Sequence, residues 1–236
     1  MNAKTSTTPE QAKTSPASTE ACCTCYLVRH GDTRQDQVRR YIGQTDLPLN
    51  AEGRAQARAL QKHLVHIPFT RICSSDLRRC METARIIAGP QGKSIRKLPA
   101  LREIHLGEWE GQSMADIHRH FPEKYQNRGQ DLAGFRPPGG ESFRDLQARA
   151  VPAFLDILQN TEGHLLVIAH AGVHRAILCH LLGRPLEELF QVPQAFGCLN
   201  LITLRDNHLA VEIINQACDQ PLNFDPDRLF YKEPCP

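Results

Sequence analysis

Three short segments of this 236-residue chain place histidine or arginine beside glycine or serine, and each follows a short apolar run. Residues 27–33 read Leu-Val-Arg-His-Gly-Asp-Thr, residues 74–79 read Ser-Ser-Asp-Leu-Arg-Arg, and residues 169–172 read Ala-His-Ala-Gly. They supply two histidines, His30 and His170, with arginines and small residues around them. Groups of this kind suit the binding and transfer of a phosphoryl group, provided that the fold brings the segments together.

A phosphate monoester is a dianion, and each of these residue types meets a need of its chemistry. Arg29 and Arg79 can match its oxygens with a planar fork of donors and stay charged at any working pH. Helices that begin after the second and third segments would add free N–H groups, and Gly31 and Gly172 would let the backbone come close. A neutral imidazole can attack phosphorus and hold it covalently, while a second, cationic histidine can stabilise the phosphoryl oxygens.

The apolar runs that precede these segments predict buried strands. Residues 26–28 and 71–73 fit short strands. Residues 165–169 are apolar throughout, which indicates a central strand covered on both faces. Residues 198–205 and 208–214 flank an Asp-Asn pair and are predicted to form an antiparallel hairpin at the end of the sheet.

Helices are expected between the strands, from the spacing of apolar residues and from capping residues. Asn50 is a candidate N-cap for the first helix, and Ser75 or Asp76 for the second. Ser142, with an acidic residue three positions on, resembles a capping box, and Pro152 should kink that helix or mark its true start. The predicted helical stretches are 51–66, 77–87 ending at Gly89-Pro90, one or two short helices around 113–127, 142–157, and 172–182 ending at Gly183.

Alternating strands and helices predict the α/β class: a three-layer α/β/α fold with a mostly parallel central sheet and one antiparallel edge hairpin. In such sheets ligands bind beyond the carboxyl ends of the strands, which is where the three segments lie. Residues 1–20 offer almost nothing to bury and are expected to be a disordered tail. Residues 21–215 would form the catalytic domain, and residues 216–236 a tail without a clear element.

Composition excludes several classes of function. The formal net charge is +2 with no basic stripe, which argues against a nucleic-acid partner; the pair Arg39-Arg40 is interpreted as solvated surface. No stretch approaches the roughly 20 apolar residues of a membrane span, and the N-terminus has no apolar signal segment, so a cytoplasmic location is expected. A homodimer is left open, because the sequence shows no clear sign of an interface.

Nine cysteines are then expected to be thiols, and neither a metal nor a cofactor is expected. Cys22, Cys23 and Cys25 include a CxxC spacing, but zinc would need further ligands and no second pair is present. Free thiols at a disordered junction, with Cys25 entering the first strand, are the preferred interpretation. His118 and His120 are expected to face solvent on a polar helix.

Residues 27–33 resemble the signature of the histidine phosphatase superfamily, in the branch that contains the cofactor-dependent phosphoglycerate mutases. Other stretches resemble the same family in the same order, over roughly residues 25–205. One such motif alone is weak, whereas the ordered set is specific. The matching stretches are 43–49 with Gly53, 74–84, 101–111, 139–142 and 170–173.

The resemblance implies roles for the residues of the three segments. His30 matches the nucleophile, and Arg29, Arg79 and His170 match the groups that bind the phosphoryl group beside it. A nucleophilic imidazole needs a fixed tautomer with one nitrogen free to attack. We therefore expect the other ring nitrogen of His30 to donate to a backbone carbonyl.

The resemblance also implies a proton donor, Glu103, which would protonate the leaving oxygen and then activate water. Gln44 matches a position at which Asn or Gln commonly lines the site in this family. Apolar neighbours are expected to bury Glu103, namely Leu101, Ile104 and Trp109. Other nearby carboxylates, interpreted as loop structure and capping, are Glu108, Glu110 and Glu141.

Three positions depart from the family pattern. Asp32 stands where Glu is common, Asp36 where Asn is usual, and His174 where an apolar residue is usual. A carboxylate near a phosphate is repulsive, so Asp36 is expected to turn away or to contact a cationic part of the substrate. These changes bear on the substrate more than on the mechanism.

Three functions remain in competition. A metal-independent phosphomonoesterase is favoured, because residues 43–46 and 139–142 resemble the small phosphatases of the family, including α-ribazole phosphatase. A phosphoglycerate mutase is the alternative, but the mutases usually have Gly-Trp at 43–44 and a different stretch at 102–107. A non-catalytic phospho-ligand binding module ranks last. Candidate substrates are small phosphomonoesters: α-ribazole 5′-phosphate, sugar phosphates and fructose 2,6-bisphosphate.

Overall fold

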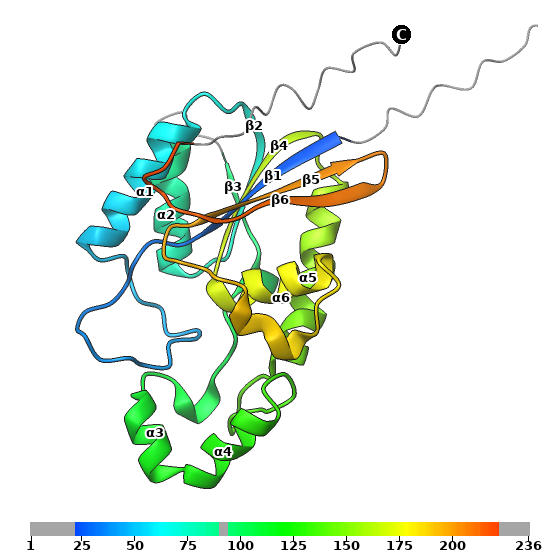
Figure 1. Ribbon diagram of the computed structural model, residues 1–236. Coiled ribbons are helices and arrows are strands. Elements are labelled where there is room, and N and C mark those ends of the chain that lie inside the picture. The colour runs from blue at the N-terminus through cyan, green and yellow to red at the C-terminus, as the bar shows by residue number, and fades with distance from the viewer. Residues whose placement is uncertain (1–21, 90–93, 222–236) are drawn as a thin grey trace, which may run out of the picture.

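A six-stranded sheet forms the centre of the structure, a computed structural model that describes residues 22–89 and 94–221 (Figure 1). The strand order is β3-β2-β4-β1-β5-β6. Strands β1 to β4 pair in parallel, whereas β5 is antiparallel to β1 and to β6. The mostly parallel sheet with an antiparallel edge hairpin is therefore confirmed. The strands are β1 Cys22–Arg29, β2 Phe69–Ser74, β3 Ile95–Lys97, β4 Gly163–Ala169, β5 Leu199–Arg205 and β6 His208–Gln216.

Helices lie at each of the predicted places. The α-helices are α1 Ala51–Leu64, α2 Arg78–Ala88, α3 Met114–His120, α4 Pro122–Gln130, α5 Phe143–Gln159 and α6 Ala171–Leu181. Within the described residues the 3-10 helices are η2 Pro99–Leu101, η3 Gly107–Trp109 and η4 Leu186–Gln191. Asn50 caps α1 by accepting a hydrogen bond from the Gly53 N–H at 2.7 Å. Ser142 begins α5 with the expected capping box, and the helix continues through Pro152, so this proline does not mark its start.

The predicted cap of α2 is wrong. Leu77 occupies the N-cap position and makes no side-chain cap, and the Arg78 N–H at the start of the helix donates to the distant Asp46 carboxylate at 2.6 Å. The hydroxyl of Ser75 lies 2.8 Å from a ring nitrogen of His170, and the carboxylate of Asp76 accepts two hydrogen bonds from Arg102. The two side chains predicted as caps of α2 therefore bind residues that are distant in the sequence.

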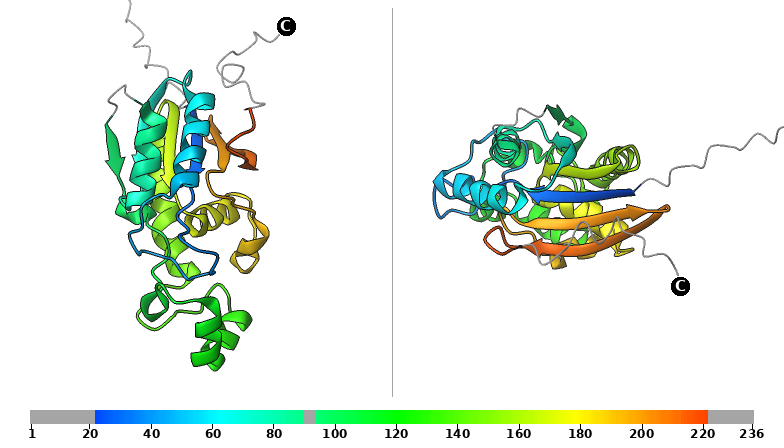
Figure 2. Two further views of the ribbon diagram at one scale, coloured as in Figure 1. Left: turned by 90° about the vertical axis from the view of Figure 1, so that its left-hand side faces the viewer. Right: turned by 90° about the horizontal axis from the view of Figure 1, so that it is seen from above.

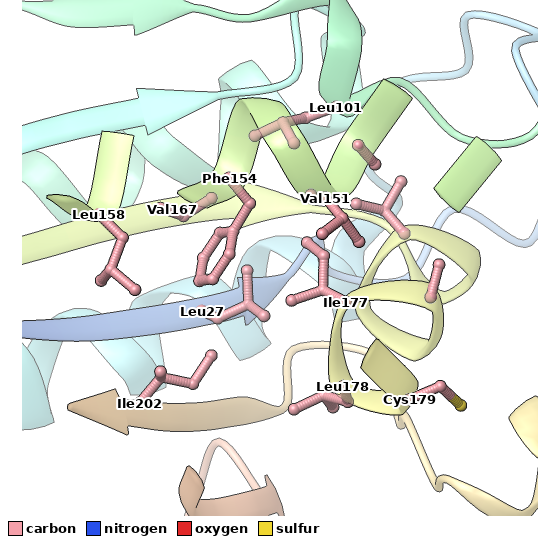
Figure 3. Packing of buried hydrophobic residues seen from close by; sticks show 14 of the residues in the cluster. Leu27, Leu101, Val151, Phe154, Leu158, Val167, Ile177, Leu178, Cys179 and Ile202 are labelled. Atoms are coloured by element: carbon pink, nitrogen blue, oxygen red, sulfur yellow. The ribbon is translucent and has the colours of Figure 1, made fainter. Parts of the chain in front are cut away.

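Two apolar layers hold the helices against the sheet. On β4, Leu165 and Val167 belong to the core cluster of α5 and α6, while Leu166 and Ile168 belong to the cluster of α1 and α2. Figure 3 shows Phe154 of α5 and Ile177 of α6 beside Leu27 of β1 in the first of these layers. The alternation along β4 confirms a central strand covered on both faces and the three-layer α/β/α architecture.

Strand β1 begins earlier than expected, and this corrects the interpretation of its cysteines. Cys23 pairs with Gly163 of β4 and Leu204 of β5, so the backbone is in the sheet from here onward. Cys23 and Cys25 are fully buried on the α5 and α6 face, and burial raises the pKa of Cys23 to about 12. Both are free thiols, as expected. Cys25 enters the strand as predicted, whereas Cys23, expected at a disordered junction, is also part of the sheet and of the core.

Helices α3 and α4 form a small extension beyond one end of the sheet (Figures 1 and 2). A separate apolar cluster centred on Tyr41, Trp109 and Ile117 supports it. His118 and His120 are exposed on α3, as expected.

None of the helices in the described part of the chain combines the length and the apolar character needed to span a bilayer. The predicted tail at 1–20, Pro90 and residues 222–236 lie outside the described residues.

Candidate active site

The three segments meet at the carboxyl ends of β1, β2 and β4, as predicted. The His30 N–H donates to the Ala169 carbonyl at 3.1 Å, which joins the end of β1 to the end of β4. The Ser75 N–H donates to the Ile168 carbonyl at 2.9 Å, which joins β2 to β4 in the same way. The rings of His30 and His170 lie with their centroids 5.1 Å apart.

His30 has the tautomer that nucleophilic attack requires. Its Nδ1 lies 2.7 Å from the Gly31 carbonyl oxygen, which can only accept, so Nδ1 carries the proton. In the neutral ring Nε2 then has a free lone pair. Burial, followed by the charges of Arg79 and Arg29, lowers the pKa of His30 well below its usual value. The imidazole is therefore neutral at physiological pH.

The hydrogen bonds and the burial of His170 favour its neutral ring. The guanidinium Nε of Arg79 can only donate, and it lies 3.2 Å from His170 Nδ1. Nδ1 must accept, so the proton sits on Nε2, which lies 2.8 Å from the Ser75 hydroxyl. Burial, followed by the charge of Arg79, lowers the pKa of His170 well below its usual value. A dianion bound nearby would be needed to favour a proton on both nitrogens.

Arg79 is buried at 1% exposure and is aimed by its backbone partners. Its two terminal nitrogens donate to the carbonyls of Thr45 at 2.8 Å and Gly43 at 2.5 Å. The Nε–H of Arg79 donates to His170. The guanidinium group therefore links the loop after β1, helix α2 and the end of β4. This placement fits a fixed cationic wall of an anion site.

Arg29 lines the same cavity as His30 and Arg79. Its Nη1 donates to the Gln194 carbonyl at 2.6 Å, and its guanidinium carbon lies 3.8 Å from the centre of the Phe196 ring. Burial lowers the pKa of Arg29 to about 10, so the group keeps its charge at neutral pH. Its Nε is buried, and no described residue accepts a hydrogen bond from it.

Glu103 is held at 9% exposure by two backbone N–H groups. Oε1 accepts from its neighbour Ile104 and Oε2 accepts from Gly172, both at 3.0 Å. Glu103 is thus buried as predicted. Trp109 packs against Tyr41 and Phe135, with ring centroids 5.2 and 5.3 Å away.

One cavity of about 510 Å³ brings Arg29, His30, Arg79 and Glu103 together. The other four predicted site residues do not line it. His170 stands behind His30, and the Gln44 amide donates to the backbone carbonyl of Glu103 at 3.0 Å. The N–H of Gly31 donates to the Thr83 hydroxyl and that of Gly172 to Glu103. In this structure neither glycine N–H is offered to a ligand.

Residues 34–40 form the outer wall of the cavity. Arg39 and Arg40, which were interpreted from the sequence as solvated surface, are therefore also part of the cavity wall. Both arginines are exposed and both line the cavity. Asp36 also lines the cavity, and its carboxylate forms an ion pair with Arg40 at 3.4 Å. Arg34 is held by Asp32, whose pKa is lowered overall: hydrogen bonds from Arg34 outweigh the opposing effect of burial.

The alternative carboxylates have structural roles or are exposed. Glu110 accepts from the N–H groups of Gly43 and Gln44 and from the Thr45 hydroxyl, which closes the loop that aims Arg79. Glu141 is paired with Arg149. Glu108 is exposed.

Several residues of the site were not anticipated. Ser75 had been interpreted as a cap, and Phe196 under Arg29 stands alone in a loop with no sequence pattern to mark it. His174 is fully buried, and its Nδ1 lies 2.8 Å from the Gln194 amide oxygen. Asn200 bonds the same amide, so a buried polar network stands behind Arg29. Of the residues in this network, the sequence analysis had singled out only His174, because an apolar residue is usual at its position in the family.

The adjacent rings of two histidines, the buried Arg79, the partly buried Arg29 and a carboxylate lie together at the carboxyl edge of an α/β sheet. Such a site defines an enzyme of phosphoryl chemistry. The family model described as the histidine phosphatase superfamily (branch 1) matches residues 25–217, and the chain belongs to this superfamily. This confirms the predicted family and the predicted class of enzyme, a histidine phosphatase.

Individual relatives also support the assignment to this superfamily. Over 193 residues the chain is 30% identical to the adenosylcobalamin/alpha-ribazole phosphatase of Salmonella typhimurium, with 80% of this chain and 95% of that protein covered. It is 37% identical over 164 residues to the "Probable phosphoglycerate mutase GpmB" of an Enterobacter species, with 68% and 75% covered. The solved structure of mycobacterial glucosyl-3-phosphoglycerate phosphatase matches with a TM-score of 0.73 at 26% identity, covering 83% of this chain and 100% of that one.

Proposed function

We propose that this protein is a metal-independent phosphomonoesterase that acts through a phosphohistidine on His30. The observation that supports it most is the tautomer of His30: Nδ1 is tied to the Gly31 carbonyl, and Nε2 is left for attack in a cavity with Arg29 and Arg79. Their two fixed positive charges offset the charge of the phosphoryl oxygens, which is the part that a metal ion plays in other phosphatases.

The reaction takes two displacements. In the first, His30 Nε2 forms a bond to phosphorus and the bond to the ester oxygen breaks, while the Glu103 carboxyl group gives its proton to the leaving alcohol. In the second, water attacks the phosphohistidine and Glu103 takes its proton. The N–P bond breaks, inorganic phosphate leaves, and His30 is restored. The bond from Gly172 to Glu103 supports this role, because it keeps the carboxylate at the wall of the His30 cavity.

The proposed substrates are small phosphorylated metabolites such as α-ribazole 5′-phosphate or a sugar phosphate, as the names of the relatives suggest. The cytoplasm, expected from the sequence, is the proposed location. A phosphoglycerate mutase is the second candidate, favoured by the 37% identity to GpmB. Gln44 argues against it, since the mutases usually have Trp at this position.

The test is phosphate release in EDTA from a panel that includes α-ribazole 5′-phosphate, sugar phosphates and 3-phosphoglycerate, with wild type and His30→Ala. The proposal expects release that survives EDTA and is lost in His30→Ala. Formation of 2-phosphoglycerate without release of phosphate would establish the mutase instead. Release that stops in EDTA would contradict the metal-independent mechanism.

A further inference from the structure

A second cavity of about 320 Å³ adjoins the first at Glu103. Both cavities are lined by Glu103, Arg40, Ile42 and Met114, whereas His30 and Arg79 belong to the first alone. The proposed mechanism leaves the second cavity without a role. Its volume lies near the lower end of the roughly 300 to 1,000 Å³ that ligand cavities occupy.

The walls of the second cavity are mainly apolar and aromatic. They come from residues 40–42 and 103–106, from the segment between η3 and α5, and from α5, α6 and η4. The cavity therefore lies where the α3–α4 extension meets the main body. The apolar residues that line it, besides those shared with the first cavity, are Tyr41, Ile104, Leu106, Leu132, Phe135, Pro137, Phe143, Ala171 and Phe190.

Two guanidinium groups stand over the Phe190 ring at the edge of this cavity. The guanidinium carbons of Arg175 and Arg128 lie 5.2 and 5.8 Å from its centroid. Phe190 is half-exposed and also contacts Phe143 edge to face, with centroids 5.8 Å apart. Stacked guanidinium and aromatic groups of this kind favour a flat ring as a further partner.

The position of Glu103 links this cavity to the leaving alcohol. If Glu103 protonates the leaving oxygen, that oxygen must lie within hydrogen-bond reach of its carboxyl group. In the proposed mechanism the phosphoryl group lies beside His30, Arg29 and Arg79, so the carbon skeleton of the alcohol extends away from these three residues. The apolar cavity begins at the same carboxylate.

We propose that the second cavity binds the alcohol part of the substrate, and that this alcohol bears an aromatic ring system. The inference rests on the proposed phosphomonoesterase function and narrows its substrate class. An alcohol that carries a second anionic group is the rival, because Arg128 and Arg175 could also pair with a carboxylate.

The test compares two monoesters of primary alcohols, ethyl phosphate and 2-(2-naphthyl)ethyl phosphate, so that the bond that breaks is the same in both. The readout is the ratio of their kcat/KM values, with 3-phosphoglycerate as a third substrate. Wild type is expected to favour the naphthyl ester by at least about tenfold, because a buried ring system removes a large apolar area from water. The preference should appear mainly in KM.

Phe190→Ala is expected to reduce this ratio about threefold or more, since one ring is lost from the wall. The matched control is Val65→Ala, which truncates an exposed apolar side chain that lines neither cavity and should leave the ratio unchanged. Equal kcat/KM values for the two esters, an unchanged ratio in Phe190→Ala, or a preference for 3-phosphoglycerate over the naphthyl ester would overturn the inference. Failure of the proposed function looks different, because then no ester releases phosphate.

Discussion

Gly172 and Glu103 are joined by a hydrogen bond across 69 residues of sequence, in which the Gly172 N–H at the start of α6 donates to Glu103 Oε2 at 3.0 Å. The contact is so close that a Cβ on Gly172 would lie 2.3 Å from Glu103 Oε1. The glycine therefore determines where the proposed proton donor sits, rather than offering its N–H to phosphate.

Gly172→Ala tests this placement. The new methyl group must push the carboxylate aside, and we expect kcat to fall by about 10-fold to 100-fold, since small displacements of a reacting group are costly. The obstacle is a side-chain end rather than backbone, so the thermal midpoint of unfolding should change little. Gly129→Ala is the control, because a Cβ there meets nothing within 4 Å. Full activity of Gly172→Ala would show that the position of Glu103 does not limit turnover.

Glu103→Gln should remove general acid and base catalysis while it keeps most of the side chain's shape. We expect kcat for an alkyl phosphate to fall by about 10² to 10⁴. The first displacement with p-nitrophenyl phosphate should be affected less, because nitrophenolate leaves without a proton. Steady-state rates for alkyl esters and rapid-mixing bursts for the nitrophenyl ester measure the two effects. Glu108→Gln, on an exposed neighbour, should behave as wild type; equal losses in both variants would mean that the wrong carboxylate has been assigned.

The buried histidines predict how stability depends on pH. The pKa values of His30 and His170 are lowered well below their usual range, and burial lowers that of His174 to about 3. In the unfolded chain each titrates near pH 6.5. Below that pH the unfolded state binds protons that the folded state does not, so the free energy of unfolding falls as the pH falls, by up to about 1.4 kcal/mol per pH unit for each histidine.

Urea unfolding between about pH 5 and pH 8 measures this slope. His174→Leu removes one of the three groups. The slope of the free energy of unfolding against pH should then decrease by the contribution of about one proton, whatever the substitution does to stability at pH 8. An unchanged slope in this variant would show that His174 is not held neutral in the folded protein.

Ser142 closes the capping box at the start of α5 and is 1% exposed. Ser142→Ala should lower the free energy of unfolding by about 1 kcal/mol, because the Asp145 N–H loses its acceptor. Ser142→Gly should cost less, since glycine leaves room for water at the cap. Urea midpoints of the two variants test the order. A larger loss for glycine would contradict the capping explanation.

Local sequence predicted the parts of the site that depend on where a strand ends and a helix begins. Runs such as 165–169 predict a buried strand, and the polar residues that follow must then emerge at its carboxyl end. For this reason the convergence of His30, Arg79 and His170 could be foreseen, and so could the α5 capping box, whose donor and acceptor are three residues apart.

Contacts between distant segments could not be foreseen. The hydroxyl of Ser75 contacts His170 instead of capping α2, the N–H of Gly172 binds Glu103, and the proton of His170 is positioned by Arg79. The second cavity likewise depends on how α4 and η4 approach each other. Each of these is a competition between local and long-range partners, which a single sequence does not resolve.

The most direct test of the central claim is to trap the covalent intermediate. Glu103→Gln is mixed with p-nitrophenyl phosphate, quenched in alkali, and digested for mass spectrometry. The first step needs no acid with this substrate, while the second lacks its base, so the intermediate should accumulate. We predict one phosphoryl group per chain, located on His30 and absent in His30→Ala. A phosphoryl group on another residue such as His170, or release of nitrophenol with no modified protein at any time, would contradict the mechanism.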